Sequence, residues 1–287
     1  MSGVPLQVLT NSLGPLATAV GTGSATISGA FQSVPQTNTV RANIKGSSFN
    51  TVRANMHPQS VPEFSTFAID LQPGGATRGW IGATPDLINY IGSIYDASAP
   101  IVDSDLDLGD ISYGNPFPTT WTPFILSRYD SYVSYYAQGA SSSGKLYSYS
   151  ESVSTTLPTS SSGFGLLVGP PSSPTIGGSN FFNDHSAVGT RPTVSWQVPT
   201  LGTATGYRLS IYNLYNDGTG ASKFAFVATL YTKQTSLVIP PELLSPGLQY
   251  VFKLSSVNLQ ARDIEQSPYR YGFPYGYSQT SSGIVTP

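Results

Sequence analysis

The sequence predicts an all-β protein built from two β-sandwich domains in tandem. Short runs of alternating apolar and polar side chains recur along the chain, with Gly, Pro, Asn and Ser between them. A length of 287 residues is enough for two domains that each close a core. Only 10% of residues are charged, but 39% are hydrophobic and 12% aromatic, which argues against disorder.

The first predicted domain covers residues 21–157 and is expected to be a sandwich. A leader or edge strand over residues 1–20 precedes it. Its predicted strands lie at Ala25–Ser28, Ser65–Leu71, Gly109–Tyr113, Phe124–Tyr129, Tyr132–Tyr136 and Lys145–Ser154. Thr84–Ile94 is the one segment where we expect a helix, because Pro85 suits a first turn and apolar residues follow along one side.

A short repeat lies near the start of this domain. Asn38–Asn43 recurs as Asn50–Asn55, offset by twelve residues, with Gly46-Ser47-Ser48 between the copies. An even offset keeps equivalent side chains on the same sheet face. The pattern predicts a hairpin whose arms share a sequence, since two copies are too few for a repeat array.

Residues 158–172 form a Pro/Ser/Gly-rich linker in this interpretation, and residues 173–287 form the second domain. Seven strands are predicted there, the first of them near Thr175–Phe182. The others are Thr193–Gln197, Tyr207–Tyr212, Phe224–Thr232, Ser236–Ile239, Tyr250–Val257 and Tyr277–Gly283.

The second domain carries a pattern typical of sandwiches. Trp196 stands in a short strand, and its indole is large enough to fill the space between two sheets. Pro246-Gly247 predicts a turn, and Tyr250 completes the segment L-x-P-G-x-x-Y, from which alternation continues to Asn258.

This pattern resembles the fibronectin type III domain over about residues 170–287, whereas residues 1–168 suggest no family. The resemblance implies an immunoglobulin-like, seven-stranded interaction module in which the Tyr250 hydroxyl bonds to upstream backbone. The structural core that it implies consists of Trp196, Tyr207, Leu209, Tyr250, Phe252 and Leu254.

Leu259–Gly276 is long for a hairpin loop and rich in aromatic residues. The resemblance implies a recognition site in this loop, although the Arg-Gly-Asp found there in some members is absent. The alternative is that these aromatics cover the end of the sandwich or pack on the first domain. The candidate ligand-binding residues are Tyr269, Arg270, Tyr271, Phe273 and Tyr275.

The single acidic cluster offers a candidate calcium site. Alternation places Asp103, Asp105 and Asp107 on one face, and carboxylates are hard oxygen ligands. Leu108 and Gly114 stand where an EF-hand loop requires Gly and Glu. The alternative is a strand edge whose acids discourage edge-to-edge pairing.

Catalytic signals are weak, so we expect no enzyme and no cofactor apart from the candidate calcium. Asp184, His185 and Ser186 supply triad residue types, but neighbours on a strand point to opposite faces. No spacing singles out a carboxylate pair for glycoside hydrolysis. An enzymatic first domain is a minor third interpretation.

The composition excludes some classes of partner and indicates where the protein acts. A net charge of −2 with scattered cations argues against nucleic acid, and no apolar run is long enough to span a membrane as a helix. The chain has no cysteine, so disulfides and thiolate sites are excluded. Low charge with abundant Tyr and Ser favours a secreted or cell-surface protein whose signal peptide is absent from this chain. The alternative is a protein that stays inside the cell, which the absence of cysteine also fits.

We therefore expect a non-catalytic extracellular interaction or structural protein, such as an adhesion, scaffold or self-assembling matrix component. Its partner is a protein or a second copy of the chain. The alternative is a carbohydrate-binding accessory module of a secreted glycan-processing system, with Trp80 and Trp121 as further sugar-stacking candidates.

Overall fold

The computed structural model describes residues 38–44, 52–72, 88–93, 106–113, 121–156, 165–259, 263–268 and 272–287. Within these ranges the chain forms fifteen strands and one short helical turn at residues 52–54. The expected all-β class is confirmed. No helix in the described part of the chain has the length and hydropathy needed to cross a bilayer.

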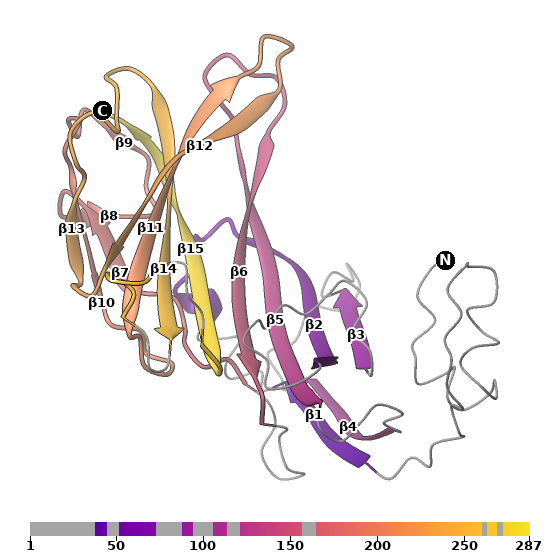
Figure 1. Cartoon of the computed structure of the whole chain (residues 1–287). Coiled ribbons are helices and arrows are strands. Elements are labelled where there is room, and N and C mark those ends of the chain that lie inside the picture. The colour runs from indigo at the N-terminus through magenta and orange to yellow at the C-terminus, as the bar shows by residue number, and fades with distance from the viewer. Residues whose placement is uncertain are drawn as a thin grey trace, which may run out of the picture.

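The described residues from 172 to the end of the chain form a two-layer sandwich (Figure 1). One layer has the strand order β13-β10-β7-β8, and the other contains the order β12-β11-β14-β15. The strands of the first layer are β7 (Ser172–Ile176), β8 (Ser179–Asn180), β10 (Thr193–Gln197) and β13 (Ser236–Val238). Those of the second are β11 (Gly206–Asn216), β12 (Ser222–Thr232), β14 (Gln249–Leu259) and β15 (Tyr275–Thr286).

The sandwich core contains all six residues expected there, which are Trp196, Tyr207, Leu209, Tyr250, Phe252 and Leu254. The Trp196 and Tyr207 rings meet edge to face at 5.2 Å. Alternation in β14 explains the burial, because Tyr250, Phe252 and Leu254 share one face. The Tyr250 hydroxyl accepts a hydrogen bond of 2.9 Å from the Ser245 N–H, so the expected bond to upstream backbone is present.

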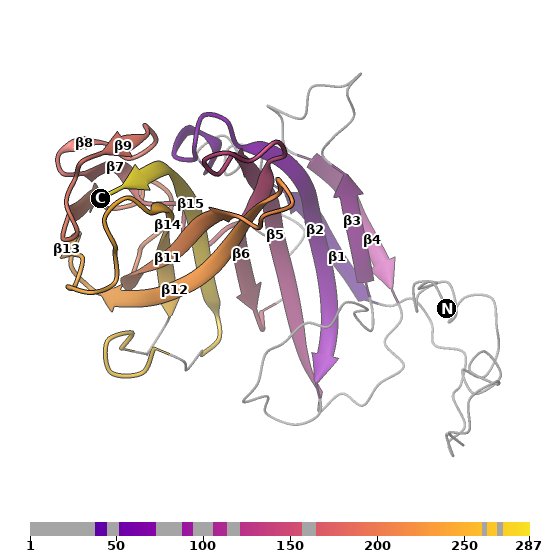
Figure 2. The same cartoon turned by 90° about the horizontal axis from the view of Figure 1, so that it is seen from above.

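The second layer continues into the N-terminal half of the chain. β15 pairs with β6 (Gly144–Ser154), and the sheet extends through β5 (Thr122–Tyr135), β2 (Val61–Gln72) and β3 (Ile88–Ser93). With the short parallel strand β9 (His185–Ser186) beside β15, this sheet has nine strands. Figure 2 shows the four-stranded layer against the β11–β14–β15 end only. One sheet therefore crosses the predicted linker, and a tandem arrangement of two separate sandwiches is not confirmed.

Two local predictions are wrong. Residues 88–93, inside the predicted helix, form strand β3, in which Ile88 pairs with Ile69 of β2. β1 (Asn38–Ile44) pairs with β4 (Leu106–Tyr113) in a separate two-stranded sheet, and not with the second copy of the repeat. That second copy contains the helical turn at residues 52–54 instead of a strand. Pairing with distant strands decided both outcomes, because short apolar runs do not distinguish helix from strand.

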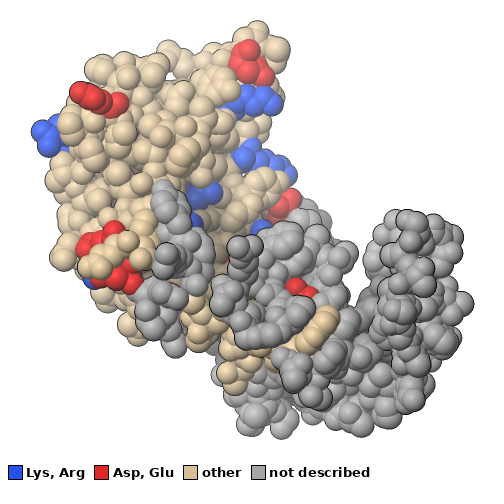
Figure 3. Space-filling view, in the orientation of Figure 1, with Lys and Arg blue, Asp and Glu red and all other residues tan. Residues whose placement is uncertain are grey.

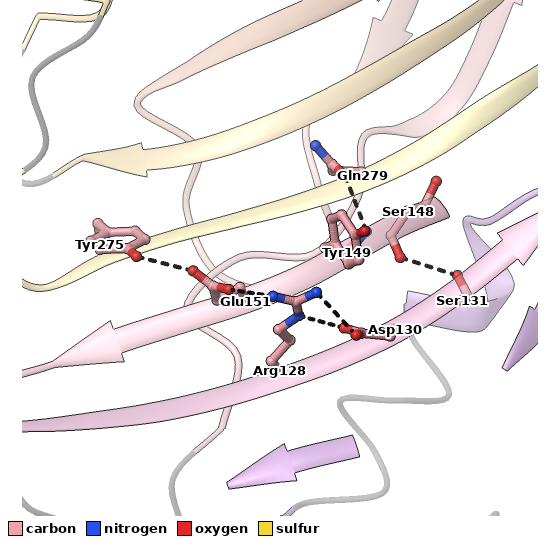
Figure 4. Close-up of polar contacts among 8 residues, drawn as sticks. All are labelled: Arg128, Asp130, Ser131, Ser148, Tyr149, Glu151, Tyr275 and Gln279. Carbon is pink, nitrogen blue, oxygen red and sulfur yellow. Dashed lines mark hydrogen bonds and ion pairs between the residues drawn. The ribbon is translucent and has the colours of Figure 1, made fainter. Parts of the chain in front are cut away.

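Buried hydroxyls line the junction between β15 and β6, which we call the serine join. Backbone pairing covers only Tyr275–Ser278 against Ser150–Val153. Beyond it, Ser148 Oγ lies 3.0 Å from Ser281 Oγ. The Tyr149 N–H donates to Gln279 Oε1 at 3.1 Å, as Figure 4 shows. The hydroxyls of the serine join belong to Ser148, Ser150, Ser152, Ser278 and Ser281, all of them buried.

Candidate functional site

The aromatic loop expected to bind ligand turns inward where it is described. Phe273 packs edge to face on Phe124 of β5, with ring centroids 4.7 Å apart. Phe273 and Tyr275 both contact the buried cluster of Ala68, Phe124, Leu126 and Val153. These two aromatics therefore pack on the N-terminal half of the sheet, as the alternative interpretation expected. Tyr269, Arg270 and Tyr271 lie outside the described residues.

The candidate calcium site is only partly described. Asp107 pairs with Asn43 across β4 and β1, whereas Asp103 and Asp105 lie outside the described residues. In the described segments, no group of three or more His, Asp and Glu side chains could hold a metal ion. The calcium site stays a prediction. Of the two further tryptophans, Trp80 also lies outside, and Trp121 is partly buried just before β5.

The Asp184–Ser186 segment pairs with the C-terminal strand, β15. His185 and Ser186 pair in parallel with Val285 and Thr286. Asp184 Oδ1 accepts a 2.8 Å hydrogen bond from the Ile284 N–H, and His185 Nε2 lies 3.0 Å from the Asn180 carbonyl oxygen. Backbone contacts account for the histidine and the carboxylate, so the three side chains do not form a triad.

His57 lies in a hollow of about 340 Å³ beside β5. Burial lowers its pKa, and its Nδ1 accepts a hydrogen bond of 3.1 Å from the Gln59 N–H. Its ring meets the rings of Tyr135 and Phe182 edge to face. An uncharged imidazole suits this aromatic packing, so the arrangement is that of a structural histidine.

Charged and aromatic side chains gather on the face of the nine-stranded sheet opposite the sandwich core, which we call the outer face. Alternation places Lys253 of β14 and Arg208 of β11 there. The strand register continues this face through Tyr277 of β15 and Glu151 of β6 to Arg128 of β5. Figure 3 shows Lys and Arg atoms along the middle of the view, between the β11–β12 and β5–β6 hairpins.

One polar network on the outer face is internally paired (Figure 4). Arg128 Nε donates to Asp130 Oδ1 at 2.6 Å, and a guanidinium nitrogen of Arg128 lies 3.7 Å from Glu151 Oε2. The Tyr275 hydroxyl donates to Glu151 Oε1 at 3.0 Å. Burial raises the pKa of both carboxyl groups, although their partners act in the opposite direction. These acids are matched to Arg128, so the network is structural.

Tyrosines flank this network. The Tyr147 and Tyr149 rings lie 6.5 Å apart and nearly parallel, at 9°. Tyr132 lies beside Tyr147, and the Lys145 ammonium sits 3.9 Å from the Tyr132 ring centroid. The Arg128 guanidinium lies 4.2 Å from the Tyr149 ring centroid. Tyr132, Tyr147 and Tyr149 therefore form a row of partly exposed rings, which we call the tyrosine row, with cations over two of them.

A second pair of cations, Arg208 and Lys253, lies on the β11–β14 part of the outer face. The Lys253 ammonium lies 5.2 Å from the Tyr212 ring centroid and 5.9 Å from that of Tyr149. Burial, and secondarily the charge of Arg208, lower the pKa of Lys253 to about 8. Unlike Arg128, these two cations form no ion pair within the described segments.

Comparison of the chain with models of known protein families gives no match, and comparison with curated proteins gives no similar sequence.

Sequence reasoning missed the outer-face residues, Arg128, Glu151, Arg208 and Lys253. One local signal was present, since Lys253 is the only charged residue in β14. Alternation does place Lys253 on the face opposite Phe252. It does not reveal that this second face is also buried, because the burial depends on strands far away in the sequence.

Proposed function

We propose that this chain is a non-catalytic interaction protein of the cell exterior that associates through the free edge of β12. Its C-terminal half would serve as a fibronectin type III-like unit. The strand order of the two layers and the Tyr250 hydrogen bond to Ser245 support that assignment.

The observation that carries the proposal is the composition of β12. This strand is eleven residues long, stands at one end of the nine-stranded sheet, and has Lys223 as its only charged residue. Phe226 is 63% exposed in the middle of it. Edge strands of monomeric proteins usually carry several charges, prolines or bulges that prevent pairing. β12 has one bulge, where its register with β11 shifts between Phe226 and Ala228, but it has no proline and a single charge. A long edge with so few of these features and with an exposed ring suits strand addition by a partner or a second copy.

Light scattering coupled to size-exclusion chromatography tests association over a range of concentrations. We expect the mass to rise with concentration, and Phe226→Lys to lower it by placing a charge on the edge. Tyr136→Lys is the matched control, because Tyr136 is 57% exposed but lies just past the end of β5. A monomer at every concentration, or equal effects of both variants, contradicts the proposal.

The tyrosine row of the outer face favours a second function, carbohydrate binding. Partly exposed, nearly parallel rings such as those of Tyr147 and Tyr149 offer aromatic surface for stacking on sugar rings. On a glycan array we expect Tyr147→Ala to abolish the signal and Tyr215→Ala to preserve it, since Tyr215 lies on β11 outside the row. Absence of any signal from the unmodified chain contradicts this function.

A further inference from the structure

A lysine is buried in the middle of the nine-stranded sheet. Lys253 is 7% exposed and lies opposite Ser210 of β11. Its neighbours Phe252 and Leu254 face the sandwich core, so its own side chain lies on the outer face. A buried ammonium is costly unless hydrogen bonds or an opposite charge compensate for the loss of water.

The neighbours of Lys253 add positive charge instead of balancing it. Arg208 lies one diagonal step away in the register, since Lys253 pairs with Ser210. The ion pairs of the described residues are Arg128 with Asp130 and Glu151, and Lys233 with Asp263. The Lys253 ammonium lies beside the Tyr212 and Tyr149 rings, and the Arg208 guanidinium lies 5.6 Å from the Tyr277 ring centroid.

Hydrogen-bonding groups at the same place are also unused. Arg208 Nε is buried and has no hydrogen-bond partner. Ser255, which pairs directly with Arg208, is fully buried, and its hydroxyl has no partner either. Gln279 pairs with Ser255 from the other side, and its Oε1 is already occupied by the Tyr149 N–H. Its amide NH₂ therefore remains as a donor. Nearly all buried polar groups in proteins have a partner, so this concentration of unpaired groups needs an explanation.

We propose that Arg208, Lys253, Ser255 and Gln279 form a binding site for a single oxyanion, a carboxylate, sulfate or phosphate group carried by a ligand. We call it the Arg208–Lys253 site. A sulfate or a phosphate dianion balances both positive charges and a carboxylate balances one of them, and each accepts hydrogen bonds from the guanidinium and the hydroxyl. The Tyr149 and Tyr212 rings on either side of the ammonium exclude water, which strengthens the attraction between the charges.

The Arg208–Lys253 site is independent of association through β12. A ligand of the Arg208–Lys253 site must carry a negative charge, whereas a sugar that stacks on the tyrosine row can be uncharged. The paired network around Arg128 offers an internal comparison. There the cation lies beside two carboxylates of the chain itself, so it has no capacity for an external anion.

Calorimetric titration of the whole chain with sodium sulfate, phosphate and acetate, at constant ionic strength and pH 7, tests the site. We expect one saturable site for at least one of these anions. Arg208→Gln and Lys253→Met should each weaken it about tenfold or more, because each removes a charged hydrogen bond. Lys223→Met, at an exposed cation of β12, should leave binding unchanged. The ranking of the three anions separates a planar carboxylate ligand from a tetrahedral one.

A pH series with sulfate, whose charge is constant, tests the role of Lys253. Among the described residues, the titratable and charged groups beside Lys253 are Arg208 and Tyr212 of β11 and Tyr149 of β6, and Tyr277 of β15 lies beside Arg208. Burial raises the pKa of Tyr149 and Tyr212, so both stay neutral through pH 9. The affinity should therefore fall between pH 7 and 9 as Lys253 loses its proton.

Equal binding by the unmodified chain and by Arg208→Gln, or no saturable binding of any of the three anions, overturns the proposal. Arg208→Gln carries this test even if Lys253→Met fails to fold, because Arg208 is only partly buried. Thermal stabilisation by sulfate alone does not support the site, since sulfate stabilises folded proteins in general.

Discussion

Two of the buried regions in the described part of this molecule are built from different chemistry. The sandwich core is apolar and aromatic, with Phe252 and Leu254 fully excluded from solvent. The serine join between β6 and β15 is equally buried but lined with hydroxyls, including those of Ser150 and Ser278. Apolar packing stabilises in proportion to buried area and tolerates imprecision in direction, whereas hydroxyls stabilise only when each finds its partner.

Because of this difference, the core mainly provides stability, and the serine join mainly determines which strand register forms. In the core, many weak contacts sum to a large free energy. At the serine join, the small size of serine lets two strands approach, and the pairing of hydroxyls fixes their register. We therefore expect the core to lose more stability per substitution, and the join to show stronger coupling between neighbouring positions.

The largest expected effect is in the core. Phe252→Ala should lower the free energy of unfolding by about 3–5 kcal/mol, because it leaves a cavity where a fully buried ring packs. Urea unfolding followed by tryptophan fluorescence measures the loss. Phe226→Ala, at a ring that is 63% exposed, is the matched control and should change stability little. Similar losses in both variants would contradict the assignment of the core.

The serine join should show a smaller effect with strong coupling. Ser150→Ala should cost about 1–3 kcal/mol, because it leaves the buried Ser278 hydroxyl without its partner. The double variant Ser150→Ala/Ser278→Ala should recover much of that loss, since no buried hydroxyl is then unpaired. A double-mutant cycle of unfolding free energies measures the coupling. Strict additivity would mean that the two hydroxyls do not stabilise each other.

The same substitution, tyrosine to phenylalanine, can be made in both regions, so that the loss of one hydroxyl hydrogen bond is compared between the sandwich core and the serine join. Tyr250→Phe removes the hydrogen bond to Ser245 in the sandwich, and Tyr135→Phe removes a 2.7 Å bond from β5 to the Ser282 carbonyl across the join. Each should cost about 1 kcal/mol in unfolding experiments. Tyr215→Phe, at an exposed ring, is the control and should be neutral. A loss in the control as large as in the other two would show that the hydroxyl bonds are not the cause.

The smallest expected effect is a pH dependence at Glu151. Burial raises the pKa of Glu151 in the folded state above its ordinary value of 4.5. Between that value and the raised pKa the folded state binds more protons than the unfolded state, so stability falls as pH rises through this window. Glu151→Gln removes this contribution. The stability of the variant relative to the unmodified chain should therefore rise between pH 4 and 7, and a constant difference would contradict the raised pKa.

The sequence was most informative where the fold depends on alternation. β10 has the predicted boundaries, and the core face of β14 is the predicted one, because period-two patterns report directly on a buried face. The hydrogen bond of the Tyr250 hydroxyl was expected from the resemblance to the fibronectin type III domain and not from alternation.

The rest depends on contacts that no local pattern encodes. Asn38–Asn43 and the described part of its copy, residues 52–55, have matching sequences but different structures, because the first pairs with β4 and the second contains a helical turn. Serine carries almost no signal about burial, so the serine join was not foreseeable. The outer-face site was missed for the same reason, because the strands that bury Lys253 are distant in the chain.

The position of β15 has a consequence for how the molecule assembles. It is the last strand along the chain, yet it stands in the middle of the large sheet, between β14 and β6. Tyr149 and Gln279, which meet across that junction, are 130 residues apart. Closing so long a loop is slow, and until it happens the open borders of β6 and β14 can bind other chains. Refolding yield should therefore fall with increasing protein concentration, which makes dilution the first condition to control in any preparation.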